Sequence, residues 1–179
     1  MKILKKGKED LEQFNIFENL LFIVFSINLI VLAIYDLKYK AVPDYLLLFA
    51  LILSFFVTKY EFFDSLKNAF LCAGALVLLN FIVTFYIQNI KARVLKDESL
   101  KTQTALGEGD IPVIATFGII LGLNEAVFAI FLSAVIAIIH EMYLRFMKKE
   151  REVPFIPSLV IGFFIEYFFN LTDIFKDFY

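Results

Sequence analysis

Two aspartates stand out because each lies at one end of an apolar run. Asp36 follows "FENLLFIVFSINLIVLAIY", and Asp110 precedes "IPVIATFGIIL". Carboxylates this close to a bilayer are costly and often functional. If the two runs form helices that pack together, the carboxylates come close and cannot both ionise easily. One then acts as a base on a water while the other, protonated, polarises a peptide carbonyl. The pair predicts aspartyl-protease chemistry.

The helix ends suggest which aspartate does which task. Asp110 would open a helix, where the dipole favours a negative charge, and Asp36 would end one, where it does not. We therefore expect Asp110 to be the base and Asp36 the protonated partner. For either aspartate taken alone, the simpler alternative is an interfacial charge at a helix end with no part in catalysis.

Two glycines precede the second aspartate in "ALGEGDIPV". Gly107 and Gly109 are expected to take unusual backbone angles and to let an extended substrate lie against the chain. Glu108, between them, is expected in solvent or on the substrate and not as a catalytic group. A loop with two ordinary turn glycines is the alternative.

Other chemistries lack their residues. The single histidine, His140, begins "HEMYL", which is not the H-E-x-x-H of a zinc protease. The single cysteine, Cys72, excludes an internal disulfide and a four-cysteine zinc site. We therefore expect no metal and no cofactor. Within the apolar runs, Asn80 is expected to hydrogen-bond between helices, and Glu166 to face the interior or lie near the far membrane interface.

The composition is that of a membrane protein. Of 179 residues 60% are hydrophobic, and the mean hydropathy is +0.78, whereas soluble domains are about 45–50% apolar. The net charge of −2 gives no support for a nucleic-acid partner. We predict an all-α integral membrane protein, a bundle of six transmembrane helices, with a polar segment over 1–16 and one membrane domain over 17–179. The six apolar runs are about 17–35, 45–58, 69–90, 111–123, 124–146 and 155–175, with Asp44 and Asn124 as expected N-caps.

The order of the runs predicts a sidedness. With six spans, the links after runs one, three and five share one side of the membrane, so Asp36, Asp110 and the stretch "VPFIPS" should converge there. That side would carry ten of the 17 basic residues and the other side seven, although four of the seven are lysines near the N-terminus. The positive-inside rule therefore favours the cytoplasm for the aspartates. The fourth run, about 13 residues, is short for a span, so we expect it to begin below the membrane surface or to extend into the preceding loop.

In three places the sequence resembles the type IV prepilin peptidases, membrane aspartyl proteases of the GxGD class. "DLKYKAVPDYL" is similar to the first motif of that family, and "GEGDIPVIATFGIILG" to its GxGD motif. "VPFIPSLVIG" resembles the third motif, usually I-P-F-G-P-x-L-x-x-G. The matching residues are Asp36, Pro43 and Asp44 in the first, Gly107, Gly109 and Asp110 in the second, and Pro154, Phe155, Pro157, Leu159 and Gly162 in the third.

The resemblance implies catalysis by Asp36 and Asp110, with the glycines, Pro43, Asp44, Pro154 and Pro157 shaping the site. It also implies prepilin-like membrane proteins as substrates, whose short basic leader is removed at the cytoplasmic face of the inner membrane. The face near Asp110 would offer counter-charges to such a leader at Asp97, Glu98 and Glu108. The cleaved protein (pilin, pseudopilin or archaellin-like) and the oligomeric state stay open.

The chain departs from the family at several points. Pro112 stands where Lys is common, and Ile156 where Gly is usual. The paired CxxC motifs of members that also methylate their product have no counterpart, so we expect a short, peptidase-only form without methylation. Two alternatives remain: a relative of presenilin and signal peptide peptidase, or a small transporter or scaffold whose acids relay protons or ions.

Overall fold

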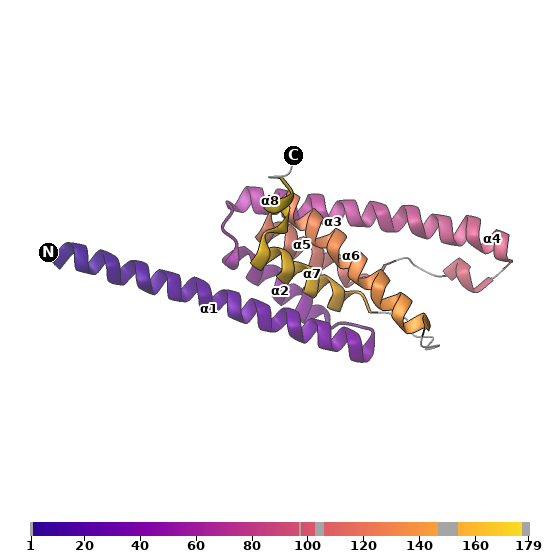
Figure 1. The fold of residues 1–179 in the computed structure, drawn as a ribbon, viewed down its shortest axis with the longest axis horizontal. Coiled ribbons are helices and arrows are strands. Elements are labelled where there is room, and N and C mark those ends of the chain that lie inside the picture. Colours follow the sequence, from indigo (N-terminus) through magenta and orange to yellow (C-terminus); the bar gives the residue numbers. More distant parts are fainter. Residues whose placement is uncertain (1, 97, 103–105, 147–153, 177–179) are drawn as a thin grey trace.

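The computed structural model describes residues 2–96, 98–102, 106–146 and 154–176, and every regular element in these ranges is a helix (Figure 1). Backbone groups in an apolar surrounding must be satisfied internally, and a helix does this within one segment. The all-α prediction is confirmed. In chain order the elements are α1 (Lys2–Tyr39), α2 (Asp44–Val57), α3 (Phe62–Phe85), the π-helix η1 (Tyr86–Lys91), α4 (Ala92–Leu95), the 3-10 helix η2 (Glu98–Thr102), α5 (Asp110–Leu121), α6 (Leu123–Phe146), α7 (Ile156–Phe169) and α8 (Leu171–Lys176).

Long and short apolar helices alternate along the chain. Three stretches are long and apolar enough to cross a membrane: Ile16–Tyr39, Phe62–Val94 and Leu123–Leu144. The helices α2, α5 and α7 have 14, 12 and 14 residues. At 1.5 Å per residue these are roughly 18–21 Å long, less than the ~30 Å of hydrocarbon. Three candidate spans are thus established by length and composition, and the count of six stays a prediction.

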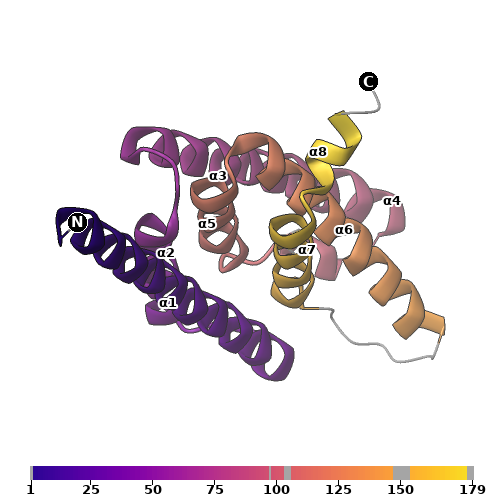
Figure 2. The same cartoon turned by 60° about the vertical axis from the view of Figure 1, so that its left-hand side comes forward.

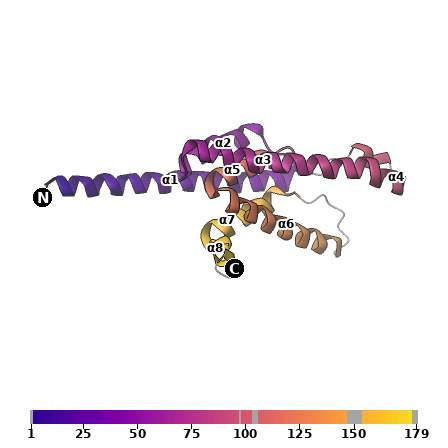
Figure 3. The ribbon, with the colours of Figure 1, turned by 90° about the horizontal axis from the view of Figure 1, so that it is seen from above.

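Several predicted boundaries move. The third run was expected to begin near residue 69, but α3 begins at Phe62 and continues through η1 and α4 to Leu95. The sixth run is divided, because Asn170 (φ 44°) ends α7 and α8 follows. Helix α1 runs without interruption from Lys2 through the predicted polar segment, and the division of the chain into 1–16 and 17–179 stays a prediction. Its N-terminal part projects from the bundle, as α4 does at the opposite end (Figures 1 and 3).

Both predicted N-caps are wrong. The N-cap of α2 is Pro43, and Asp44 is the first helical residue, with no side-chain capping bond. Asn124 lies inside α6, which begins at Leu123 directly after Gly122. Local sequence favoured Asp and Asn as caps, but α2 begins one residue and α6 two residues earlier than that rule indicates.

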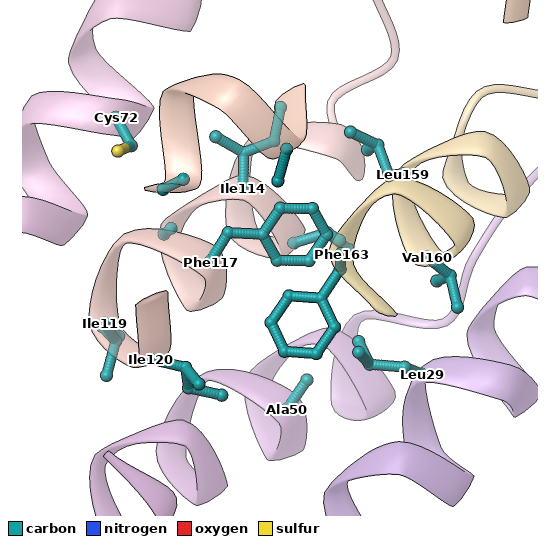
Figure 4. Close-up of a cluster of buried hydrophobic side chains, with 14 of the residues drawn as sticks. Leu29, Ala50, Cys72, Ile114, Phe117, Ile119, Ile120, Leu159, Val160 and Phe163 are labelled. Atoms are coloured by element: carbon teal, nitrogen blue, oxygen red, sulfur yellow. The ribbon is translucent and has the colours of Figure 1, made fainter. Parts of the chain in front are cut away.

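Helix α5 is the centre of the bundle, between α2 on one side and α6 and α7 on the other (Figure 2). All its residues except Ile111 and Pro112 are buried. The Phe117 ring lies 4.8 Å from the Phe163 ring of α7, tilted by 31° (Figure 4). The Phe163 ring also meets the Phe25 ring of α1 edge-on at 5.9 Å. Between helices in lipid such van der Waals packing replaces the hydrophobic effect as the driving force.

The C-terminal end of α5 is closed within the bundle. The last carbonyls of a helix lack partners in their own helix. Here the Thr58 hydroxyl donates to the Ile119 carbonyl at 2.6 Å, and the Tyr60 hydroxyl donates to the Leu121 carbonyl at 2.9 Å. The link between α2 and α3 therefore fixes α5 at one end, which leaves the other end, at Asp110, to the site.

Candidate active site

The three short helices begin at the same end of the bundle, around one open cavity of about 490 Å³. The links between α1 and α2, before α5, and before α7 all contribute to it, so the predicted convergence of the three links is confirmed. The residues that line it are Asp36, Lys40, Ala41, Val42, Asp44, Leu47, Leu106, Gly107, Glu108, Gly109, Asp110, Pro112, Pro154, Phe155 and Ile156.

Asp36 lies in the last turn of α1 and is buried, with 8% of its surface exposed. Its Oδ2 accepts a hydrogen bond from the Ile156 backbone N–H at 3.0 Å. Ile156 is the first residue of α7, so this N–H has no acceptor within its own helix. The Asp36 carboxyl thus holds the start of α7 against the end of α1.

Asp110 is the first residue of α5 and is also buried, with 5% exposed. Its Oδ2 accepts the Gly107 N–H at 3.1 Å, while its own N–H donates to the Gly107 carbonyl at 3.2 Å. The two residues close a tight reciprocal turn. This turn holds the Asp110 carboxyl beside the N-terminus of α5, in the wall of the cavity.

The helix-end argument for the two protonation states does not hold. It counted only α1 for Asp36, whereas the N-terminus of α7 faces the same carboxyl through the Ile156 N–H. The positive end of α7 opposes the negative end of α1. Helix dipoles therefore do not distinguish Asp36 from Asp110, and a coupled pair is better described as one titrating unit.

The glycines act through space and not through unusual angles. Gly109 has φ −68° and ψ −21°, ordinary right-handed values, and among the described glycines only Gly122 has positive φ. The prediction of unusual angles is therefore wrong. Both glycines line the cavity, and a Cβ added at Gly107 would lie 3.4 Å from Asp110 Oδ2. The missing side chain of Gly107 leaves the approach to that carboxyl open, whereas a Cβ at Gly109 would face Leu47, Ile156 and Val42.

Of the other predicted site residues, Asp44 and Pro154 line the cavity, and Pro43 and Pro157 do not. Pro43 caps α2 and lines an adjoining cleft with Tyr35 and Tyr39. Pro157 is the second residue of α7, where a missing N–H costs no intrahelical bond. These two prolines set where the helices start.

The two departures from the family pattern lie on the cavity wall. Pro112 is in the first turn of α5, where it too removes no intrahelical bond. Ile156 bonds Asp36 through its backbone, so the bond does not depend on its side chain. That side chain packs 3.8 Å from where a Gly109 Cβ would lie, with Leu47 and Val42 beside it. The Ile156 side chain thus fills space in the cavity wall that a glycine would leave open.

Sequence reasoning missed several wall residues. Lys40, Val42, Leu47 and Leu106 all line the cavity. Lys40 and Val42 lie inside the stretch that resembles the first motif, and Leu47 directly follows it. Leu106 directly precedes the GxGD motif. Proximity to a motif was the signal that could have found them.

Glu166 and His140 are not part of this cavity wall. Glu166 is fully buried near the opposite end of α7, where its Oε1 accepts the Thr172 N–H at 3.1 Å. It joins α7 to α8. Of its two expected locations, the structure supports the bundle interior. Within the described ranges no three His, Cys, Asp or Glu side chains gather as metal ligands would.

Comparison with known proteins gives one match. A family model described as the type IV leader peptidase family matches residues 23–142, more than half of the chain and a range that includes Asp36 and Asp110. It ends before the third motif at Pro154. No curated protein and no solved structure matches the chain. On the strength of the family match the chain, an all-helical protein with three helices able to span a membrane, belongs to the type IV leader peptidase family and is a protease.

Proposed function

We propose that the protein is a membrane aspartyl endopeptidase that removes the short basic leader of type IV prepilin-like precursors, with Asp36 and Asp110 as its catalytic acids. One observation carries the proposal. Two buried carboxyls, Asp36 on α1 and Asp110 on α5, lie 74 positions apart in the sequence and line the same open cavity. Buried acids in such a cavity are expected to have a task, because burial without one is costly.

The reaction follows from two acids that share one proton. The ionised carboxyl takes a proton from a water, whose oxygen adds to the scissile carbonyl carbon while the protonated carboxyl donates to the carbonyl oxygen. In the collapse of the tetrahedral diol, the carboxyl that took the water proton gives it to the leaving nitrogen as the C–N bond breaks. A diol hydroxyl returns its proton to the other carboxylate, which restores the shared-proton pair. The products are a free leader carboxylate and a new amine on the apolar helix.

The helix termini support negative charge at this place. The N-termini of α2, α5 and α7 border the cavity at Asp44, Asp110 and Ile156. Helix N-termini carry partial positive charge. Three of them around one cavity reduce the free-energy cost of a carboxylate and of a developing oxyanion.

Of the three acids expected to attract a basic leader, Glu108 is the strongest candidate. Glu108 is exposed at the cavity. Glu98 is already paired with Lys101 at 2.6 Å, and that hydrogen bond lowers the pKa of the Glu98 carboxyl. Asp97 lies outside the described residues. We therefore assign leader attraction to Glu108.

The test is co-expression with prepilins from the same genome, scored by leader removal. Asp36→Asn and Asp110→Asn should each reduce cleavage by at least about 10⁴-fold, as expected for acids that work as a unit. Asn keeps an Oδ acceptor for the Ile156 or Gly107 N–H, so the fold should persist.

The matched control is Asp44→Asn. Asp44 lines the same cavity but is exposed and makes no capping bond, so its loss should cost cleavage far less. Near-normal processing by Asp36→Asn or by Asp110→Asn would refute the two-acid mechanism.

A further inference from the structure

The link that carries Gly107 and Asp110 is tied to α3 by one side chain. Asn80, half-buried on α3, accepts the Leu106 backbone N–H on its Oδ1 at 3.1 Å. The same oxygen accepts the Thr84 hydroxyl at 3.2 Å. The expected bond between helices is therefore a bond from a helix to a loop.

The tie acts directly on the turn at Asp110. Leu106 precedes Gly107, whose N–H is the donor to Asp110 Oδ2. The Leu106 side chain packs on the core and lines the cavity. A shift of Leu106 therefore moves both the Gly107 donor and the cavity wall.

The N-terminal part of the link is attached farther from the cavity, at the end of α3. Beyond the bundle, α3 continues as η1 and α4, the chain reverses at Lys96 (φ 53°), and η2 packs back on η1. These contacts fix the start of the link at the distant end of α3. Asn80 fixes its end, beside the site.

A side chain is needed at this place for a physical reason. The backbone carbonyls of a helix interior are occupied by their own i→i+4 bonds, so α3 offers the loop no main-chain acceptor. A loop N–H left without a partner next to an apolar helix is costly. The side-chain amide oxygen of Asn80 supplies the acceptor.

We propose that Asn80 is a positioning residue for Asp110, acting through Leu106 and Gly107. This role rests on the proposed function of the aspartates. Asn80 does not line the cavity. Its loss should therefore impair turnover and not substrate binding.

Three variants separate positioning from general stability. Asn80→Ala removes the acceptor. Asn80→Asp keeps it, and both neighbours of Oδ1 are donors, so a carboxyl suits the place. Asn89→Ala is the matched control, because the exposed Asn89 side-chain amide donates to the Phe85 carbonyl four residues earlier, at 3.1 Å.

In a cleavage assay with purified enzyme, Asn80→Ala should lower kcat about 10- to 100-fold with little change in KM, as expected for a displacement of roughly 1 Å. Asn80→Asp should recover most of kcat, and Asn89→Ala should equal the unmodified protein. Unchanged kcat in Asn80→Ala, or a loss confined to KM, would overturn the proposal.

Hydrogen exchange tests the tie even if the proposed substrate is wrong. The peptide that contains Leu106 and Gly107 should exchange faster in Asn80→Ala than in Asn89→Ala, with α5 beyond its first turn unchanged. Equal exchange would overturn the tie itself. Absence of prepilin cleavage by the unmodified enzyme, with faster exchange in Asn80→Ala, would instead refute the proposed function.

Discussion

Asp36 connects two helices that are remote in the sequence. Its backbone belongs to the last turn of α1, and its carboxyl holds the first N–H of α7, 120 residues further on. Asp110, by contrast, bonds only three residues back, at Gly107. One acid of the pair is thus set by tertiary packing and the other by a local turn. Changes in the packing of α1 on α7 should displace Asp36 first.

Glu108 gives a prediction at the scale of a single residue. Glu108→Lys should raise KM for substrates with a basic leader, because like charges then meet at the cavity. The expected effect is several-fold at low salt and smaller at 0.5 M salt, since exposed charges are screened. Peptidase assays at both salt concentrations measure it.

The control for Glu108 is Glu125→Lys. Glu125 lines a separate cavity with Lys59, Tyr60 and Tyr167, so the same change of net charge occurs away from the aspartates. Equal KM effects in the two variants would remove the steering role of Glu108 and leave the catalytic pair untouched.

At the scale of elements, α5 owes its place to a close approach to α3. A Cβ added at Gly118 would lie 2.6 Å from the Asn68 carbonyl oxygen, a backbone atom that cannot yield alone. Small residues at such crossings let helix backbones pack tightly in membranes. The position of Asp110 therefore depends on a glycine two turns further along its helix.

Gly118→Ala should destabilise the protein by about 1–3 kcal/mol, because the two helices must separate. Thermal unfolding in detergent would show a lowered midpoint. Gly109→Ala is the matched comparison: the added Cβ would meet nothing closer than 3.7 Å, and φ −68° suits alanine.

The two glycines should therefore separate stability from function. For Gly109→Ala we expect an unchanged or slightly raised midpoint together with reduced cleavage, because a substrate strand would meet the new methyl. Full cleavage by Gly109→Ala would show that no substrate backbone comes close at that residue.

The same elements show what the sequence could predict. Apolar runs between polar links identified α2, α5 and α6 nearly to their ends, because burial and helix formation are encoded locally. The bond from Ile156 to Asp36 and the tie from Asn80 to Leu106 could not be predicted. Each depends on the relative placement of separate segments, for which a single sequence carries no local signal.

The whole molecule is arranged so that all three short helices start at the cavity. If all six apolar helices cross the membrane, the links at the cavity share one face, which we propose is cytoplasmic. Cysteine labelling tests this in a Cys72→Ala background, since Cys72 is the single cysteine and is buried.

Cysteines placed at Lys40 and at Phe62 should label from opposite sides of the membrane. Lys40 is at the cavity, and Phe62 is exposed at the start of α3. In intact cells a membrane-impermeant reagent should reach the cysteine at 62 and not the one at 40. Labelling of both from outside would contradict the six-helix topology.

The shortness of α2 has a consequence for the surrounding lipid. Its outer face presents apolar side chains, among them Leu48, Phe49, Ile52 and Phe56, over a helix of only roughly 21 Å. If α2 crosses the membrane, acyl chains that meet this face must compress or tilt, at a fraction of a kcal/mol for each ångström of mismatch. The bilayer is then thinned beside a helix whose start borders the aspartates. A precursor arriving along that side would have its leader junction brought out of the hydrocarbon by the membrane's own deformation.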